Sequence, residues 1–189
     1  MTAVGKKLFT AATAGDIRLL DLPQLTLAAT LCGHTAIVND LCLRGRRLFS
    51  ASSDDTIKVW DVLQLSLVDT LYGHTGPVLK LLLHGHYIYS SSADCSVRVW
   101  DATHFTTVAV LTGHMDRVRC MAVADGRLWT GSDDYTVRLW RHSSDCCSSS
   151  APKVKLGVVS VNSVDEKEQR SIISNSCKEI GSEYFDIPD

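Results

Sequence analysis

The same short motifs return in this chain every 40 residues, and this period constrains the fold more than any other feature. A Gly-His dipeptide and a later tryptophan each occur three times at this spacing, at His34, Trp60, His74, Trp100, His114 and Trp140. Runs such as TIKVW and SVRVW alternate apolar and polar residues, which is typical of half-buried strands. Turns such as RGR, HGH and ADG separate further β-rich runs, including AIVNDLCL and LFSAS, and a fourth run such as LSLVDTL precedes the next Gly-His. We therefore expect an all-β protein with four short strands per repeat.

Gly-His followed by Trp-Asp at this period resembles the WD-repeat family, whose fold is the β-propeller. The resemblance covers Leu8 to Trp140 and includes three concordant copies. The third copy departs from the pattern because it ends Trp140-Arg141. The first copy, LFTAATAGDIRLLD, has Leu20 where the tryptophan would stand and no preceding Gly-His. By the 40-residue offset, Met1 falls inside the innermost strand of that degenerate blade.

The resemblance implies four-stranded antiparallel blades, and the chain has room for about 3.5–4 of them. Propellers close with about 4–8 blades, so we expect a partial β-propeller. A half ring exposes apolar blade faces and unpaired strand edges. We therefore favour a fragment or truncated form of a longer protein with more blades. Completion of the ring by a second chain and closure of four blades alone are the alternatives.

The expected domain organisation follows the repeats and one change in composition. Residues 1–142 form the WD-repeat region and contain no glutamate, whereas every glutamate of the chain lies after residue 142. The expected blades are a degenerate partial one at 1–31 and full ones at 32–71, 72–111 and 112–142. A Ser/Cys linker then spans 143–153, a closing strand 154–161, and an acidic, flexible tail 162–189. Ser163 and Glu166 fit a capping box, which predicts a short helix to about Ser174.

A set of four polar and aromatic residues repeats with constant offsets in each full copy. The three sets are His34, Ser52, Asp54 and Trp60; His74, Ser92, Asp94 and Trp100; and His114, Ser132, Asp134 and Trp140. A catalytic site needs one constellation at one cleft, so three copies indicate a structural role and no catalytic residue is predicted. In the WD-repeat family, the resemblance implies, these residues form a hydrogen-bonded network that ties the loop before the inner strand to the two middle strands. The side-chain donors and acceptors permit a satisfied chain from Trp through Ser and His to Asp.

The resemblance also implies where partners dock. Three positions per blade face one rim: the third and fifth residues after the Gly-His histidine, and the residue before the turn aspartate. Carried onto this chain they are Ile37, Asn39, Ser53, Pro77, Leu79, Ala93, Arg117, Arg119 and Asp133. The alternative interpretation of each is a strand-entry residue. Arg117 and Arg119, with Met115 and Tyr135 nearby, stand out because an arginine pair beside an aromatic ring can hold a carboxylate or a phosphorylated peptide.

Other patterns give weaker signals. His84 and His86 could chelate a metal, but two histidines in a tight turn lack further ligands, so neither a metal nor another cofactor is predicted. Basic residues are not clustered with stacking aromatics, which makes nucleic-acid binding a weak alternative. We interpret Arg44, Arg46 and Arg47 as a solvated turn.

Compartment and function class follow from what remains. Seven cysteines without a CxxC motif, a signal peptide or a membrane-spanning apolar run indicate the cytoplasm or the nucleus. We interpret the adjacent Cys146 and Cys147 as exposed thiols, with lipidation or redox pairing as the alternative. The pattern favours a non-catalytic protein–protein scaffold in an intracellular signalling or ubiquitin-related assembly, over a nucleic-acid-associated factor or an enzyme. The sequences at 60–63 and 100–103 lack the Trp-Asp-x-Arg motif that joins such propellers to a cullin adaptor.

Overall fold

The computed structural model describes residues 1–12, 14–124, 126–142 and 156–161, and in these residues the chain forms four antiparallel sheets. We call them blades 1 to 4. Their strands are β1 (Thr2–Val4), β2 (Lys7–Ala11), β3 (Ile17–Asp21) and β4 (Thr26–Leu31); β5 (Val38–Arg44), β6 (Arg47–Ser52), β7 (Ile57–Asp61) and β8 (Ser66–Leu71); β9 (Val78–His84), β10 (Tyr87–Ser92), β11 (Val97–Asp101) and β12 (Thr107–Leu111); and β13 (Val118–Ala124), β14 (Arg127–Ser132), β15 (Val137–His142) and β16 (Leu156–Val161).

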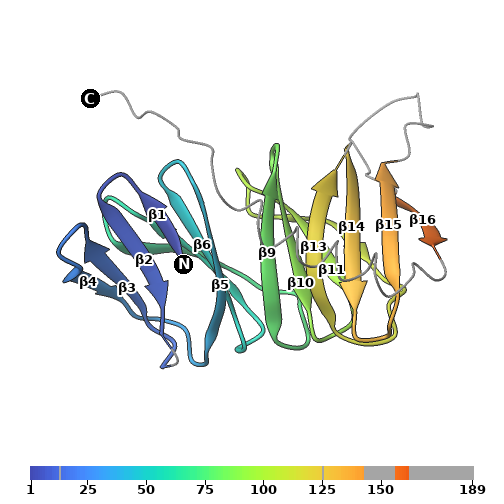
Figure 1. The fold of residues 1–189 in the computed structure, drawn as a ribbon, viewed down its shortest axis with the longest axis horizontal. Helices are drawn as coiled ribbons and strands as arrows, with labels where there is room; N and C mark the ends of the chain where they lie inside the picture. Colours follow the sequence, from blue (N-terminus) through green and yellow to red (C-terminus); the bar gives the residue numbers. More distant parts are fainter. Residues whose placement is uncertain (13, 125, 143–155, 162–189) are drawn as a thin grey trace.

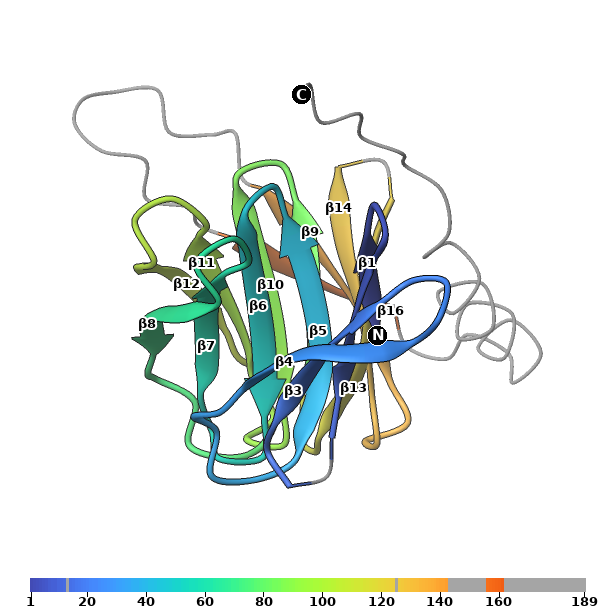
Figure 2. The same cartoon turned by 90° about the vertical axis from the view of Figure 1, so that its left-hand side faces the viewer.

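Each blade is a meander in which every strand pairs with the next strand along the chain. The blades stand in a row, with blade 1 and blade 4 at its two ends (Figure 1). Viewed from the blade 1 end, the sheets follow one another in depth (Figure 2). The predicted all-β, partial β-propeller is confirmed. Within the described residues, there is no helix of the length and hydropathy that a membrane span requires.

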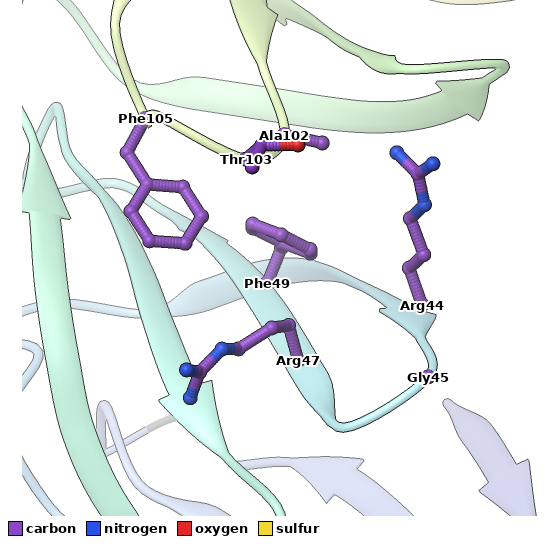
Figure 3. A pocket seen from close by; sticks show the side chains of 7 residues that line it. All are labelled: Arg44, Gly45, Arg47, Phe49, Ala102, Thr103 and Phe105. Carbon is purple, nitrogen blue, oxygen red and sulfur yellow. The ribbon is translucent and has the colours of Figure 1, made fainter.

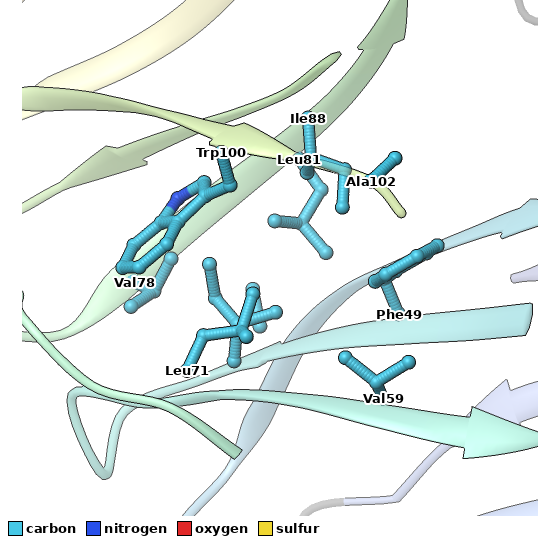
Figure 4. Packing of buried hydrophobic residues seen from close by; sticks show 10 residues of the cluster. Phe49, Val59, Leu71, Val78, Leu81, Ile88, Trp100 and Ala102 are labelled. Carbon is cyan, nitrogen blue, oxygen red and sulfur yellow. The ribbon is translucent and has the colours of Figure 1, made fainter. Parts of the chain in front are cut away.

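Apolar side chains fill the contact between consecutive blades, which we call a seam. Between blades 2 and 3, Phe49 and Val59 of one blade meet Val78, Ile88 and Trp100 of the next (Figure 4). All five side chains are at most 2% exposed. Burial of one such side chain stabilises the fold by roughly 1.5–3 kcal/mol. The core of this protein therefore lies in its seams, because the two faces of an interior blade are both covered.

In the two end blades, residues at positions equivalent to these core residues are less deeply buried. Trp129 of blade 4 corresponds to Phe49 of blade 2 and is half-buried, whereas Phe49 is fully buried. Leu20 of blade 1 stands at the tryptophan position and is also half-buried. Among the described residues, the outward faces of blades 1 and 4 are thus apolar and incompletely covered.

The loops at the two edges of the row form two rims. We call the one built from the β4–β5, β6–β7, β8–β9, β10–β11, β12–β13 and β14–β15 loops the Gly-His rim, and it lies at the bottom of Figure 1. The turns within the β5–β6, β9–β10 and β13–β14 hairpins form the opposite rim. The closing strand expected at 154–161 is present as β16, which pairs with β15 from His142 to Val137. The helix predicted from Ser163, the linker and the acidic tail lie outside the described residues.

Candidate functional site

Each of blades 2, 3 and 4 carries a hydrogen-bonded chain of four side chains. In blade 3 the indole Nε1 of Trp100 donates to Ser90 Oγ over 2.8 Å, and His74 Nε2 lies 2.8 Å from the same oxygen. The other ring nitrogen, Nδ1 of His74, lies 2.7 Å from Asp94 Oδ2. Blade 2 repeats this arrangement with Trp60, Ser50, His34 and Asp54. Blade 4 repeats it with Trp140, Thr130, His114 and Asp134.

The hydroxyl of the network is not the predicted one. Ser52, Ser92 and Ser132 were assigned to it by sequence, but each sits two residues too far along its strand. Their hydroxyls instead donate to the carbonyl oxygens of Ala36, Gly76 and Asp116 and accept the N–H groups of Asp54, Asp94 and Asp134. The register explains the difference, because Trp60 pairs with Leu48 and its diagonal neighbour on the same face is Ser50.

The aspartate of each network also organises the rim. Asp54 accepts the main-chain N–H of Thr35 through Oδ2 and both the N–H and the hydroxyl of Thr56 through Oδ1. Burial alone would raise the pKa of Asp54, but hydrogen bonds from Thr56, His34 and Thr35 outweigh it and lower that pKa to about 2. The same balance lowers the pKa of Asp94 and of Asp134. The carboxylates are therefore ionised and hold two rim loops together.

His34 and His114 stay neutral in this setting. Burial lowers the pKa of His34 and of His114 more than their aspartates raise it. A neutral imidazole donates from one nitrogen and accepts at the other, so Nδ1 donates to the carboxylate and Nε2 accepts from the hydroxyl. Each polar group of the chain has a partner within the chain. The arrangement is thus suited to locking loops in place, and it leaves the rim side chains to meet a partner.

Blade 1 does not form the hydrogen-bonded network of the other three blades. Leu20 stands at the tryptophan position, and Thr10 at the hydroxyl position donates to the carbonyl oxygen of Arg18 instead. The position after the missing aspartate is Gly15, with a φ of +87°. In the other blades Asp55, Cys95 and Tyr135 take that place with positive φ values of 67°, 67° and 62°.

A β-bulge places one predicted partner-binding residue of each blade. In blade 2, Val38 pairs with Ser52 and Asp40 with Ala51, so Asn39 is the extra residue. The equivalent extra residues are Leu79 in blade 3 and Arg119 in blade 4. A bulge re-aims the side chain of its extra residue and recurs beside functional sites. The fifth position after the histidine is therefore the extra residue of a bulge in all three blades.

The predicted partner-binding residues differ in how exposed their side chains are and in whether they already form hydrogen bonds. Asn39 is half-buried, and its Nδ2 donates to Ser53 Oγ at 3.0 Å and to the Val78 carbonyl oxygen at 2.8 Å, so it bridges the seam to blade 3. Ile37 is 48% exposed on the rim. The remaining blade 3 positions, Pro77, Leu79 and Ala93, are all partly buried.

Blade 4 presents the most accessible group, which we call the blade-4 patch: Met115, Arg117, Arg119, Asp133 and Tyr135. Met115 is 84% exposed and Tyr135 is 91% exposed. Arg119 is already engaged, because its Nε donates to Asp133 Oδ2 at 2.8 Å. The Arg117 guanidinium is exposed and has no hydrogen-bond partner within the described part of the chain. The two arginines therefore do not act as an equivalent pair, and Arg117 is the available cation.

Comparison with known families identifies the class of protein. A model described as "WD domain, G-beta repeat" matches residues 25–61, 65–101 and 105–141, which together are more than half of the chain. The chain belongs to the WD-repeat family, whose members are in general non-catalytic scaffolds for protein interaction.

One solved structure gives a similar picture of the fold. The crystal structure of the computationally designed Ika8 protein (crystal packing No.1 in P63) aligns with a TM-score of 0.68 and 24% identity. The alignment covers 74% of this chain and 44% of that one, so this chain spans less than half the length of the designed protein. At this identity the likeness concerns the fold alone. Comparison with curated proteins gives no match.

Proposed function

We propose that this chain binds partner proteins through the Gly-His rim, with the blade-4 patch as its principal contact. The rim displays four large exposed side chains, Ile37, Tyr72, Met115 and Tyr135, which are 48%, 73%, 84% and 91% exposed. Tyrosine and methionine are enriched at protein interfaces. The three networks fix the loops that carry them, which reduces the entropy lost when a partner binds.

The conformation of Tyr135 is the observation that carries this proposal. Its φ of +62° is disfavoured for a bulky residue, and its ring is 91% exposed and contributes no packing. A strained backbone conformation whose side chain adds no stabilising contact indicates a functional role for that residue. Glycine occupies the equivalent place in blade 1, so the fold itself does not require an aromatic ring there.

The charges of the patch indicate the chemistry of the partner. Arg117 offers an exposed guanidinium without a partner among the described residues, whereas the Arg119–Asp133 ion pair supplies little net charge. A guanidinium binds carboxylate or phosphate oxygens with charge-assisted hydrogen bonds. We therefore propose an acidic or phosphorylated segment of the partner as the bound element. We further propose a non-catalytic role in an intracellular signalling or ubiquitin-related assembly, in the cytoplasm or the nucleus.

Affinity capture tests the proposal. Partners captured by the wild-type chain are identified by mass spectrometry and compared with those captured by the Arg117→Ala/Arg119→Ala variant. The control is Arg127→Ala, which removes one exposed charge from the opposite rim of the same blade. We expect the double variant to lose a partner that the control keeps. Equal recovery by all three proteins would overturn the blade-4 patch as the docking site.

A further inference from the structure

A pocket on the opposite rim lies between blades 2 and 3, at the other edge of the row from the Gly-His rim. It has a volume of about 470 Å³ and is lined by Arg44, Gly45, Arg47, Phe49, Ala102, Thr103 and Phe105 (Figure 3). Pockets that bind small ligands or single side chains measure about 300–1,000 Å³ and combine apolar walls with a few polar groups. Two phenyl rings and two guanidinium groups match that description.

The apolar wall is formed by two rings from different blades. Phe49 of β6 and Phe105 of the β11–β12 turn pack edge to face, with centroids 6.2 Å apart. Phe105 has a φ of +58° and is half-buried. Leu25 and Leu65 hold the equivalent positions of blades 1 and 2, also with positive φ. The turn geometry is thus common to the blades, whereas an aromatic ring at this place belongs to blade 3 alone among these three.

The positive charge of the pocket is not neutralised by its neighbours. Asp61 accepts from Arg47 Nη1 at 2.9 Å and from Arg46 Nη2 at 3.3 Å, so one carboxylate faces two arginines. Its other oxygen accepts the N–H groups of Leu63 and Gln64. Asp101, at the blade 3 side, is held by the N–H groups beside it and by His104. Arg46 is exposed, as the interpretation of Arg44, Arg46 and Arg47 as a solvated turn predicts, whereas Arg44 and Arg47 are partly buried.

Arg44 is the least satisfied of these groups. Its Nη2 lies 3.4 Å from Nδ1 of His86, across the seam in blade 3, and its Nη1 is buried without a hydrogen-bond partner in the part of the chain that the structure describes. A buried donor without an acceptor destabilises the state that contains it. In Figure 3 the side chains of Arg44 and Arg47 lie on either side of Phe49. A carboxylate that entered beside the phenyl rings would supply the acceptor that Arg44 lacks.

We propose that this pocket binds an acidic peptide segment of a partner protein, in which an aspartate or glutamate adjoins an aromatic side chain. The ring packs against Phe105, whose half-buried side chain contacts Phe49, and the carboxylate pairs with Arg44. Charge complementarity selects this occupant, because the arginines repel a basic segment and a neutral acceptor forms a weaker hydrogen bond with a guanidinium than a carboxylate does. The site is separate from the Gly-His rim, so the chain holds two partner segments at opposite edges of the row.

Nuclear magnetic resonance with defined peptides tests the pocket directly. The ¹⁵N-labelled chain is titrated to millimolar concentration with the peptides acetyl-Gly-Asp-Phe-Gly-amide and acetyl-Gly-Glu-Phe-Gly-amide, and with their Asn and Gln counterparts. We expect the acidic peptides to shift the amide signals of Gly45, Thr103 and Phe105. The amide counterparts should bind at least tenfold more weakly, and added salt should weaken the acidic peptides.

Variants locate the contact. Arg44→Gln, which leaves the Asp61 pairs intact, should weaken the acidic peptides about tenfold or more. The matched controls Arg127→Gln on the same rim and Arg117→Gln on the Gly-His rim should leave their affinity unchanged. The proposal is overturned if neither acidic peptide shifts these signals, if Arg44→Gln binds as well as the wild type, or if the shifts fall on the Gly-His rim. The last outcome would support the blade-4 patch instead.

Discussion

The indole of Trp100 donates its N–H to Ser90, and the next serine along the strand, Ser91, faces the other side of the sheet, where its hydroxyl has no hydrogen-bond partner among the described residues. Both side chains are fully buried. Two adjacent serines of one strand therefore differ in their hydrogen bonding: Ser90 is the centre of a network, whereas the buried hydroxyl of Ser91 is unsatisfied among the described residues. Blade 2 has Ala51 at the position of Ser91.

Replacement of the two serines by alanine should have effects of different size and sign. Ser90→Ala leaves Trp100 Nε1 and His74 Nε2 without their shared partner, so we expect the free energy of unfolding to fall by about 1–3 kcal/mol. Ser91→Ala removes a hydroxyl that has no partner and should leave stability unchanged or raise it. Urea unfolding of the two variants measures both. Equal destabilisation by the two substitutions would refute the assignment of Ser90.

The seam between blades 2 and 3 contains a polar bridge that stability measurements can isolate. Asp40 Oδ2 accepts the main-chain N–H of Leu81 over 3.0 Å, and the equivalent residues of blades 3 and 4 are Lys80 and Cys120. Asp40→Ala leaves the N–H of Leu81 without this acceptor, so we expect the free energy of unfolding to fall by about 1–3 kcal/mol. Lys80 lies 3.9 Å from the same carboxylate and its side chain is 51% exposed, so Lys80→Ala should change stability by less than about 1 kcal/mol. A larger effect of Lys80 than of Asp40 in chemical denaturation would contradict this picture.

Stability should decrease with acidity in two steps. The pKa values of His34 and His114 are lower in the folded chain than the ordinary 6.5, so the unfolded chain takes up these protons first and stability falls as the pH drops below about 6.5. The pKa of Asp54 is lowered from 3.8 to about 2, and those of Asp94 and Asp134 are lowered too. Their contribution is present above pH 3.8 and is lost below it. Urea midpoints measured from pH 8 to pH 3 should show both declines; a midpoint that rises between pH 7 and pH 5 would be inconsistent with buried neutral histidines.

Tyr135 allows binding to be separated from stability. Tyr135→Asn removes the exposed ring and places a residue that tolerates positive φ at the strained position, so stability should rise by about 0.5–1 kcal/mol. Capture of a blade-4 partner should weaken in the same variant. Met115→Asn is the control, because it also removes an exposed side chain but relieves no strain, and its stability should stay within about 0.5 kcal/mol of the wild type. Thermal unfolding and capture assays on both variants decide the outcome.

Sequence reasoning predicted most of the fold because the signals were periodic. A motif that returns every 40 residues predicts one blade per repeat, and the alternation of apolar and polar residues in TIKVW predicts a strand. The histidines, aspartates and tryptophans of the networks follow from the same period, since each occupies a position that holds the same residue type in all three copies. The hydroxyl does not. Ser50 and Ser52 share one strand face, and only the pairing of Trp60 with Leu48 shows which of them the indole reaches. In blade 4 the residue is a threonine, so residue type was no guide either.

Features that depend on two blades at once were beyond the sequence. The bond from Asn39 to the Val78 carbonyl oxygen requires the seam geometry. Within blade 4, the Arg119–Asp133 pair joins strand β13 to the β14–β15 loop, 14 residues away in sequence, and no local pattern predicts it. The pocket on the opposite rim takes Arg44 from one blade and Phe105 from the next, at a separation in sequence that no local pattern reports.

The arrangement of the seams has a consequence for how this molecule opens. Contacts between blades run from each blade to the next in sequence, through β2 with β5, β5 and β6 with β9, and β9 and β10 with β13. Such a row is a one-dimensional array of coupled units, in which stability is a sum over units and the couplings between neighbours. The half-buried Leu20 and Trp129 mark the ends, where a unit has one coupling instead of two. Opening should therefore advance inward from the ends, and amide hydrogen exchange should be slowest in the strands of blades 2 and 3.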